Sequence, residues 1–221
     1  MEEWCIPEAN AEYVAKMEDV LEVYQRPYDP LRPAVCIDEM NRQLVEERRI
    51  PCKPGQSEKV DSEYVRKGVM DVFMIAEPLA GKRDTVITQT RTAVDFAHVL
   101  KHTSDVLYPQ AEKIILVTDN LNTHTIAALY KAFVPAEARR LAERFEWHYT
   151  PKHGSWLDMA EIELSILSRQ ALAKPKPDAD TFVQAVRSWT ARRNAECSKI
   201  HWQFTTTDAR IKLAKLYPSI V

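Results

Sequence analysis

The sequence predicts an α/β fold in which a mixed five-stranded sheet carries helices on both faces. Two observations lead to this prediction. In the first half of the chain, short apolar runs follow one another with turns and loops between them, and in the second half apolar runs alternate with segments of helical period. Strands joined by turns pair antiparallel and strands joined by helices pair parallel, so one sheet that contains both is mixed.

The first 30 residues join a helix-forming stretch, AEYVAKMEDVLEVYQ, to a proline-rich exit, RPYDPLRP. They predict a helical segment with a linker into the fold. Apolar and β-branched runs follow, and the turn Gly81-Lys82-Arg83 predicts a hairpin. We expect strands at 34–39, 71–78 and 84–90, with a further candidate strand at 43–50 and a polar loop at 53–63.

The run KIILVTDN at 113–120 predicts a buried strand, because it is a continuous β-branched and leucine run. FEWHYT at 145–150 predicts the other strand of this half. Helices are expected at 92–107, 125–133, 136–144, about 156–173, 180–195 and 208–216. We divide the chain into an N-terminal segment (1–30), a main domain (31–175) and a C-terminal helical extension on the same domain (176–221).

The composition and the absence of certain motifs exclude several classes of protein function. With 221 residues, 45% hydrophobic and 28% charged, the chain can form a full hydrophobic core. The net charge of −2 counts mildly against nucleic-acid binding, although local basic patches are compatible with it. GxGxxG and GxxxxGK[ST] are absent, which excludes the usual dinucleotide and P-loop sites, and the scattered cysteines do not suggest zinc. No apolar run is long enough for a membrane span and no signal peptide is visible, so we expect a cytoplasmic protein without a membrane partner.

Three acids lie at the ends of predicted elements. Asp38 ends the first strand, Asp119 ends the strand KIILVTD, and Glu161 lies in the first turns of the helix after the last strand. Carboxylates are the ligands that Mg²⁺ and Mn²⁺ prefer, and a pair of such ions can cleave a phosphodiester. The pattern alone is weak among 32 acidic residues, since Asp119 also suits a turn or cap and Glu161 a solvated helix face.

The residues around these acids are more specific. The segments VCIDE, VTDNLNTHT and FEWHYTPKHGSWLDMAEIELSILSRQ resemble the DDE-superfamily transposases of insertion sequences related to the mariner group, and the resemblance covers about residues 30–217. It implies an RNase H-like fold, two Mg²⁺ or Mn²⁺ ions, and DNA strand cleavage and transfer at transposon ends. Asp38, Asp119 and Glu161 match the catalytic, metal-binding acids of the family.

The chain departs from the family pattern at two places. Asp158 stands where the family usually has asparagine, three residues before the catalytic glutamate. Glu163 lies about 200° from Glu161 around a helix, so both cannot face one site; the choice of Glu161 rests on the family motif. Only 37 residues precede Asp38, too few for the usual helix-turn-helix module and linker. We therefore expect weak, unspecific DNA binding by this chain alone, with a separately encoded helix-turn-helix subunit as a possible partner.

Several residues are candidates for DNA contacts, with transposon ends and target DNA as the implied partners and a homodimer on DNA as the implied assembly. Amides at the start of the helix after the last strand can hold a phosphate, and Trp156 can stack on a base or pack in the core. His124 can touch DNA, orient a metal ligand or simply pack. The candidates are Lys152, His153, Ser155, Trp156, His124, Arg139 and Arg140.

Two alternatives stay open at this point. The chain could be an RNase H-type nuclease with another substrate, or an inactive or truncated transposase remnant that binds DNA or dimerises. No expected acid is missing, which favours an active enzyme.

Overall fold

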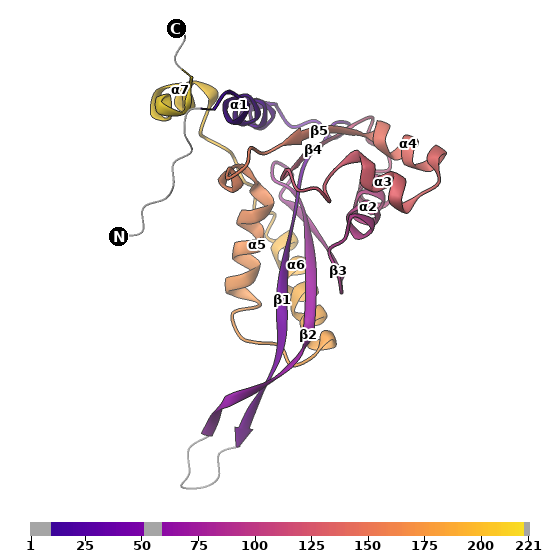
Figure 1. Ribbon diagram of the computed structural model, residues 1–221, viewed down its shortest axis with the longest axis vertical. Helices are drawn as coiled ribbons and strands as arrows, with labels where there is room; N and C mark the ends of the chain where they lie inside the picture. The colour runs from indigo at the N-terminus through magenta and orange to yellow at the C-terminus, as the bar shows by residue number, and fades with distance from the viewer. Residues whose placement is uncertain (1–9, 51–58, 219–221) are drawn as a thin grey trace.

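The computed structural model describes residues 10–50 and 59–218. Its centre is a five-stranded mixed sheet in the order β3-β2-β1-β4-β5 (Figure 1). β1 pairs antiparallel with β2 and parallel with β4, β2 pairs antiparallel with β3, and β4 pairs parallel with β5. The strands are β1 (Ala34–Ile50), β2 (Lys59–Glu77), β3 (Lys82–Thr88), β4 (Ile114–Thr118) and β5 (Phe145–Tyr149). The predicted mixed five-stranded sheet is confirmed.

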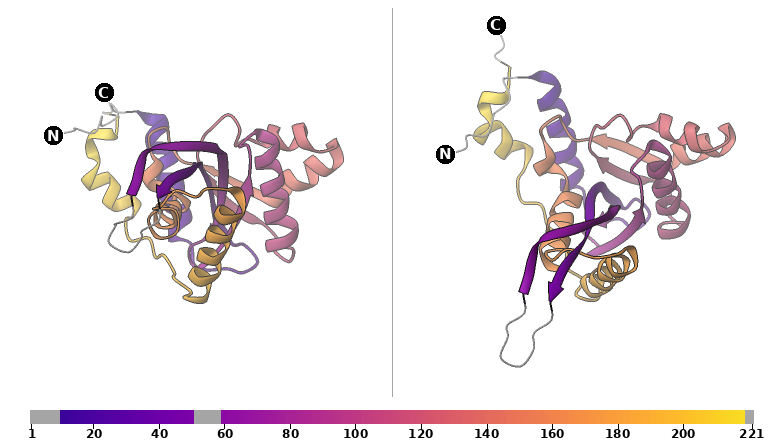
Figure 2. Two further views of the ribbon diagram at one scale, coloured as in Figure 1. Left: turned by 90° about the horizontal axis from the view of Figure 1, so that it is seen from below. Right: turned by 60° about the horizontal axis from the view of Figure 1, so that its bottom comes forward.

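Helices cover both faces of this sheet (Figure 2). One face packs against α1 (Ala11–Gln25), α5 (Met159–Gln170) and α6 (Ala179–Ala195), and the other against α2 (Ala93–His102), α3 (Ile126–Ala132) and α4 (Pro135–Arg144). Single helical turns follow or precede these elements at η1 (Thr103–Leu107), η2 (Ser155–Leu157) and η3 (Ala214–Leu216), and α7 (Thr206–Lys212) lies near the end. Within the described residues, no helix is long and apolar enough to cross a membrane.

The alternation of side chains along β1 divides the core into two parts. Val35 and Ile37 belong to the cluster under α2, α3 and α4, whereas Cys36 belongs to the cluster under α1, α5 and α6. Successive strand residues point to opposite faces, so Asp38 points to the α5 side and Glu39 to the α2 side. We call these the α5 face and the α2 face of the sheet.

β1 and β2 form a hairpin that is longer than the rest of the sheet (Figure 1). The sequence suggested two strands at 34–39 and 43–50, but the backbone continues through both as one strand. The expected loop at 53–63 is also partly strand, because β2 begins at Lys59; the remainder of that loop lies outside the described residues. Polar side chains along this hairpin hid the strand pattern, since the extension has no third strand or helix along its full length to demand apolar residues.

The turn between β2 and β3 needs its glycine. Gly81 has a φ of 67°, a left-handed conformation that side chains disfavour, and an added Cβ would lie 2.8 Å from the carbonyl oxygen of Cys197. Arg83, two residues after Gly81, is buried. Its guanidinium group donates to Glu163 of α5, which Arg193 of α6 also contacts.

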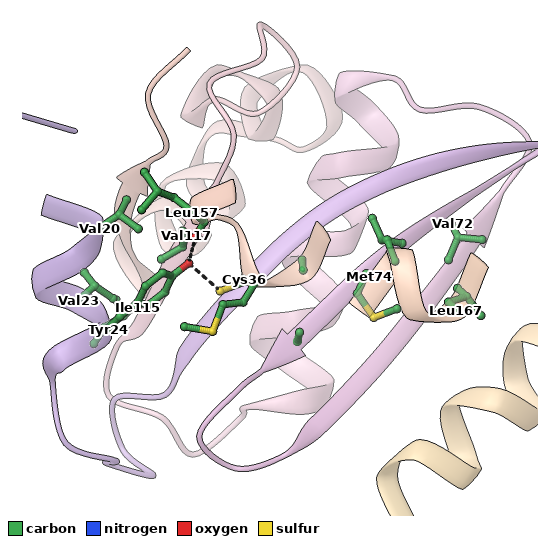
Figure 3. Close-up of a cluster of buried hydrophobic side chains, with 14 of the residues drawn as sticks. Val20, Val23, Tyr24, Cys36, Val72, Met74, Ile115, Val117, Leu157 and Leu167 are labelled. Carbon is green, nitrogen blue, oxygen red and sulfur yellow. Dashed lines mark hydrogen bonds between the residues drawn. The ribbon is translucent and has the colours of Figure 1, made fainter. Parts of the chain in front are cut away.

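α1 is anchored to the start of α5 by a buried tyrosine. Tyr24 Oη donates to the carbonyl of Leu157 at 2.5 Å and lies 3.5 Å from Cys36 Sγ (Figure 3). Met17, Val20 and Leu21 on the same helix are fully buried in the α5-face core. Burial raises the pKa values of the Tyr24 hydroxyl and the Cys36 thiol, so both stay protonated. The proposed division of the chain at residues 30 and 175 stays a prediction.

Candidate active site

Asp38 and Asp119 lie on the neighbouring strands β1 and β4. These strands are parallel, and Ile37 pairs with Thr118 in their register. Asp119 follows the carboxyl end of β4, the kind of position where α/β folds bind ligands, and Asp38 is the residue after Ile37 on β1. The prediction that Asp38 ends its strand is wrong, because β1 continues to Ile50 and Asp38 pairs with Met74 of β2. The backbone N–H of Glu39 donates to Asp38 Oδ1 at 2.8 Å, which fixes the first carboxylate.

Glu161 approaches from α5. Asp158 caps this helix by accepting a hydrogen bond from the Ala160 N–H at 2.8 Å, and Glu161 follows in the first turn. The sequence predicted one helix from about residue 156, but the structure has the short turn η2, then Asp158 in extended conformation, then α5. Asp158 therefore follows η2 and caps α5. The break between these two helical segments sets the direction of α5 and the position of Glu161 in its first turn.

The electrostatics show that these acids lie near one another. Burial, together with the negative charges of Glu39, Asp119 and Glu161, raises the pKa of Asp38 to about 7, although the hydrogen bond from Glu39 N–H opposes the change. Burial and the charge of Asp38 also raise the pKa of Asp158, with smaller contributions from Asp119 and Glu161. Carboxylates that raise one another's pKa in this way form a site in need of positive charge.

Glu163 has a different role from Glu161. Its side chain is completely buried, with Oε1 2.7 Å from Arg83 Nη2 and 3.2 Å from Arg193 Nη2. Glu161 is exposed on another side of the helix, and its charge acts on Asp38. Glu161 and Glu163 thus lie on different sides of α5, as the helical period requires. Glu163 holds α5 against β3 and α6.

His124 lies beneath Asp119 rather than on the surface. The side chain is 1% exposed, its Nδ1 makes a short hydrogen bond with Asp119 Oδ1, and its Nε2 lies 3.0 Å from Glu39 Oε2. Burial acts to lower the pKa of His124, but the contacts with Asp119 and Glu39 outweigh it and raise the pKa to about 9. This placement favours the orienting role considered from the sequence over direct contact with DNA.

The acids suit a hard divalent cation. Their donors are all oxygens, their charges repel, and Asp158 Oδ2 is buried without a hydrogen-bond partner among the described residues. Within residues 10–50 and 59–218, however, no group of three or more histidine, cysteine, aspartate or glutamate side chains is arranged closely enough to hold a metal ion. The acids are close enough to interact through their charges but do not form a closed ligand set.

The loop before α5 presents several of the predicted DNA contacts. Lys152, His153 and Ser155 are exposed, and His153 has a φ of 63°. Trp156 is 40% exposed, donates from Nε1 to Tyr13 Oη at 3.2 Å and stacks on Trp202 at a centroid distance of 6.1 Å. Trp156 therefore packs against α1 and the C-terminal segment, while part of its indole ring stays exposed to solvent.

Arg139 and Arg140 lie on α4, on the other face of the sheet from α5. Arg139 Nε donates to Glu143 at 2.7 Å, and Arg140 binds Asp105 and Glu137 with both ends of its guanidinium group. Both side chains are exposed, but their positive charges are already paired with carboxylates. The structure does not bring them together with the acids.

Sequence reasoning missed Glu39. Glu39 directly follows the predicted ligand Asp38. Because successive strand residues point to opposite faces, Glu39 points to the α2 face, where His124 lies. The only signal was the sequence DE at the end of a strand together with a histidine that had no assigned partner.

Comparisons with known proteins agree with this arrangement. The family described as DDE superfamily endonuclease matches residues 33–183, which is more than half of the chain. Among solved structures, the mariner Mos1 paired-end complex with Mg is similar at a TM-score of 0.57 and 17% identity, covering 99% of this chain and 67% of that chain. The Mos1 strand transfer complex is similar at a TM-score of 0.54 and 15% identity, covering 90% and 66%.

The Mos1 mariner paired-end complex with Mn gives a TM-score of 0.50 and 16% identity, covering 91% of this chain and 67% of that chain. This chain therefore spans about two thirds of the length of the structures it resembles. No curated protein matches the chain. At these identities the structures establish a common fold, which is RNase H-like, as predicted. With the family match over residues 33–183, the chain belongs to the DDE superfamily of endonucleases.

Proposed function

We propose that the chain is the catalytic domain of a DNA transposase, which cleaves and transfers DNA strands at transposon ends with two divalent ions, Mg²⁺ or Mn²⁺. Asp38, Asp119 and Glu161 would hold the ions. The observation that carries the proposal is the charge interaction among acids from three separate elements: Asp119 and Glu161 both act to raise the pKa of Asp38. Several of the solved structures with the same fold are described as paired-end or strand transfer complexes, two of them with Mg or Mn.

The residues would divide the work as follows. When bound, the metal ions supply Lewis-acid chemistry that activates a water or a 3′-hydroxyl and stabilises the leaving oxygen of a phosphodiester. Asp38 is held by the Glu39 N–H within β1, and Asp119 is held by His124 after β4, so two ligands would come from the sheet. Glu161 is exposed and comes from the helix, so it faces the side from which a DNA strand can enter. Asp158 is buried and interacts with the charge of Asp38, and its raised pKa favours the neutral carboxyl group.

DNA would approach along the start of α5. Lys152, His153 and Ser155 are exposed there, and backbone amides of such loops bind phosphates. Trp156 can stack on an unpaired base with its open face. Arg139 and Arg140 lie on α4, away from this surface, and would have to exchange carboxylate partners for phosphates to bind DNA. A homodimer on DNA completes the proposal.

The first test is nicking of supercoiled plasmid DNA in Mn²⁺ by the wild type and by Asp119→Ala. We expect nicking by the wild type and a loss of at least about 100-fold in the variant, because a metal ligand is removed. Glu22→Ala is the matched control, since Glu22 is an exposed acid on α1. Equal nicking by wild type and Asp119→Ala would remove Asp119 from the site, and no nicking by either would favour an inactive remnant.

A second test separates a transposase from a nuclease. A labelled DNA with a free 3′-hydroxyl is incubated with the chain, Mn²⁺ and a plasmid, and the products are examined for label joined to the plasmid. Joined products require attack by a DNA 3′-hydroxyl, which is expected of a transposase. Cleavage without joining, especially of the RNA strand in an RNA–DNA duplex, would instead support an RNase H-type nuclease.

A further inference from the structure

Two acids, Glu39 on β1 and Asp119 after β4, are connected through one histidine. Asp119 follows β4 at the strand ends, and Glu39 points from β1 to the α2 face. His124 lies between them, with Nδ1 bound to Asp119 Oδ1 and Nε2 3.0 Å from Glu39 Oε2. The side chain of Glu39 is 4% exposed and that of His124 is 1% exposed, whereas that of Asp119 is 33% exposed. The connection thus runs from the interior to the surface and ends at a proposed metal ligand.

The surroundings hold the imidazole ring in one orientation. Phe96 of α2 packs on it at a centroid distance of 4.2 Å and an interplanar angle of 32°. Thr118 Oγ1 lies 3.4 Å from Nδ1, and the His124 N–H donates to the Leu121 carbonyl at 2.9 Å. Turning the ring would break the Phe96 contact, the hydrogen bond from Nδ1 to Asp119 and the 3.0 Å approach of Nε2 to Glu39.

We infer that Glu39 and His124 are positioning residues that set the orientation of the Asp119 carboxylate from the α2 face of the sheet. The inference rests on the proposed function, because it treats Asp119 as a metal ligand. An exposed aspartate at a strand end otherwise chooses among several rotamers, and the neighbouring charge of Asp38 repels it from the site. The buried His124 Nδ1 and the Leu121 N–H, at 3.3 Å, both contact Oδ1 of Asp119, which restricts those rotamers.

A carboxylate lies at each nitrogen of the ring. Asp119 Oδ1 contacts Nδ1, and Glu39 Oε2 lies 3.0 Å from Nε2, so Glu39 holds the side of the ring opposite Asp119. Asp71, buried nearby on β2, adds to the negative charge around Glu39. Groups that orient a metal ligand in this way typically change metal affinity by about 10- to 100-fold when removed.

The test measures Mn²⁺ binding to the purified chain by electron paramagnetic resonance, without DNA, in four variants. His124→Asn places an amide N–H near the position of Nδ1 and retains a donor to Asp119, whereas His124→Gln places it near Nε2 and loses that donor. Glu39→Gln keeps the shape but removes the charge. His102→Asn is the control, because His102 forms a similar pair with Asp84 at 2.6 Å on the side of α2, outside the acidic site.

We expect His124→Gln to weaken Mn²⁺ binding by about 10-fold or more, His124→Asn by less than about 3-fold, and Glu39→Gln by an intermediate factor. His102→Asn should bind as the wild type does. Thermal unfolding of each variant separates lost folding from lost orientation; if His124→Gln does not fold, the comparison of Glu39→Gln with the wild type decides. Unchanged affinity in the folded His124→Gln or Glu39→Gln protein would overturn the inference, whereas a wild type that binds no Mn²⁺ would overturn the proposed function instead.

Discussion

Arg83 and Glu163 form an ion pair that solvent does not reach: Nη2 lies 2.7 Å from Oε1, and the two side chains are 1% and 0% exposed. Arg83 is the second residue of β3, and Glu163 lies on α5. Arg193 of α6 also contacts Glu163, and Asn194 exchanges hydrogen bonds with the backbone of Arg83 at 2.7 and 2.8 Å. Three elements are therefore joined at one carboxylate, two residues from the proposed ligand Glu161.

Replacing Glu163 with alanine should destabilise the fold strongly. The change leaves the buried Arg83 guanidinium without its partner, and breaking buried pairs in this way costs about 3–5 kcal/mol. Urea denaturation followed by circular dichroism measures the free energy of unfolding. Glu161→Ala is the matched control on the same helix and should change that free energy by less than about 0.5 kcal/mol. A similar small change for Glu163→Ala would show that the pair is not formed.

Tyr24→Phe should loosen the contact between α1 and the start of α5. The variant removes the hydroxyl that donates to the Leu157 carbonyl at 2.5 Å and leaves that carbonyl buried and unpaired, at a cost of about 1–3 kcal/mol. Thermal unfolding should record a lower midpoint than for the wild type. Tyr28→Phe, at a tyrosine that is 52% exposed, is expected to have no measurable effect. Equal midpoints for both variants would speak against a structural role for the Tyr24 hydroxyl.

Glu146 should make the free energy of unfolding depend on pH in the acidic range. Burial acts to raise its pKa, but hydrogen bonds from Arg26, His148 and Arg32 outweigh this and lower the pKa from 4.5 to about 2. A carboxylate with a lowered pKa in the folded state adds stability above the unfolded-state pKa, and this stability is lost as the pH falls from about 4.5 toward about 2. The side chain is 27% exposed, so after solvent screening we expect about 1 kcal/mol.

The measurement compares the wild type with Glu146→Gln by urea denaturation between neutral and acidic pH. The wild type should be the more stable of the two near pH 6, and the difference should vanish as the pH approaches about 2. A difference that is constant over this range, or that grows on acidification, would contradict the assigned direction of the pKa.

Divalent cations should stabilise the folded protein. A cation that binds the acids only in the folded state raises the unfolding free energy by about 2.7 kcal/mol at a concentration 100 times its dissociation constant. We expect the thermal midpoint to rise with Mn²⁺ or Mg²⁺ concentration for the wild type and to stay constant for Asp119→Ala. A parallel rise in both proteins would indicate binding elsewhere on the acidic surface.

The order of elements could be predicted from sequence, but several of their details could not. Hydrophobic period located the strands and helices of the second half closely, because each is buried on a definite face. The helix expected at 92–107 is less regular than predicted, because it continues as π-helix from Thr103 to Leu107. Its phase changes there, and Val106 is 62% exposed, which a fixed 100° period does not describe.

The candidate site was predicted less completely than the fold. Asp38, Asp119 and Glu161 were selected because predicted strand ends and a specific motif marked them, and Asp119 and Glu161 act on the charge of Asp38. Their role as metal ligands stays a prediction, and Asp38 lies within β1 and not at its end. Glu39 was missed because its role depends on a contact between β1 and the segment before α3, which no local pattern contains. Arg139 and Arg140 read as a basic cluster, but their carboxylate partners on neighbouring helices were not visible in sequence.

The buried carboxylate of Glu163 on α5 also limits which insertions and deletions the sequence tolerates. Inserting or deleting one residue between Asp158 and Glu163 would rotate the rest of the helix by about 100°. Either the Arg83 contact or the capped helix start would then be lost, even if every other side chain were kept. The spacing from the cap to Glu163 should therefore tolerate substitutions at exposed positions such as Ile162 but no change of length.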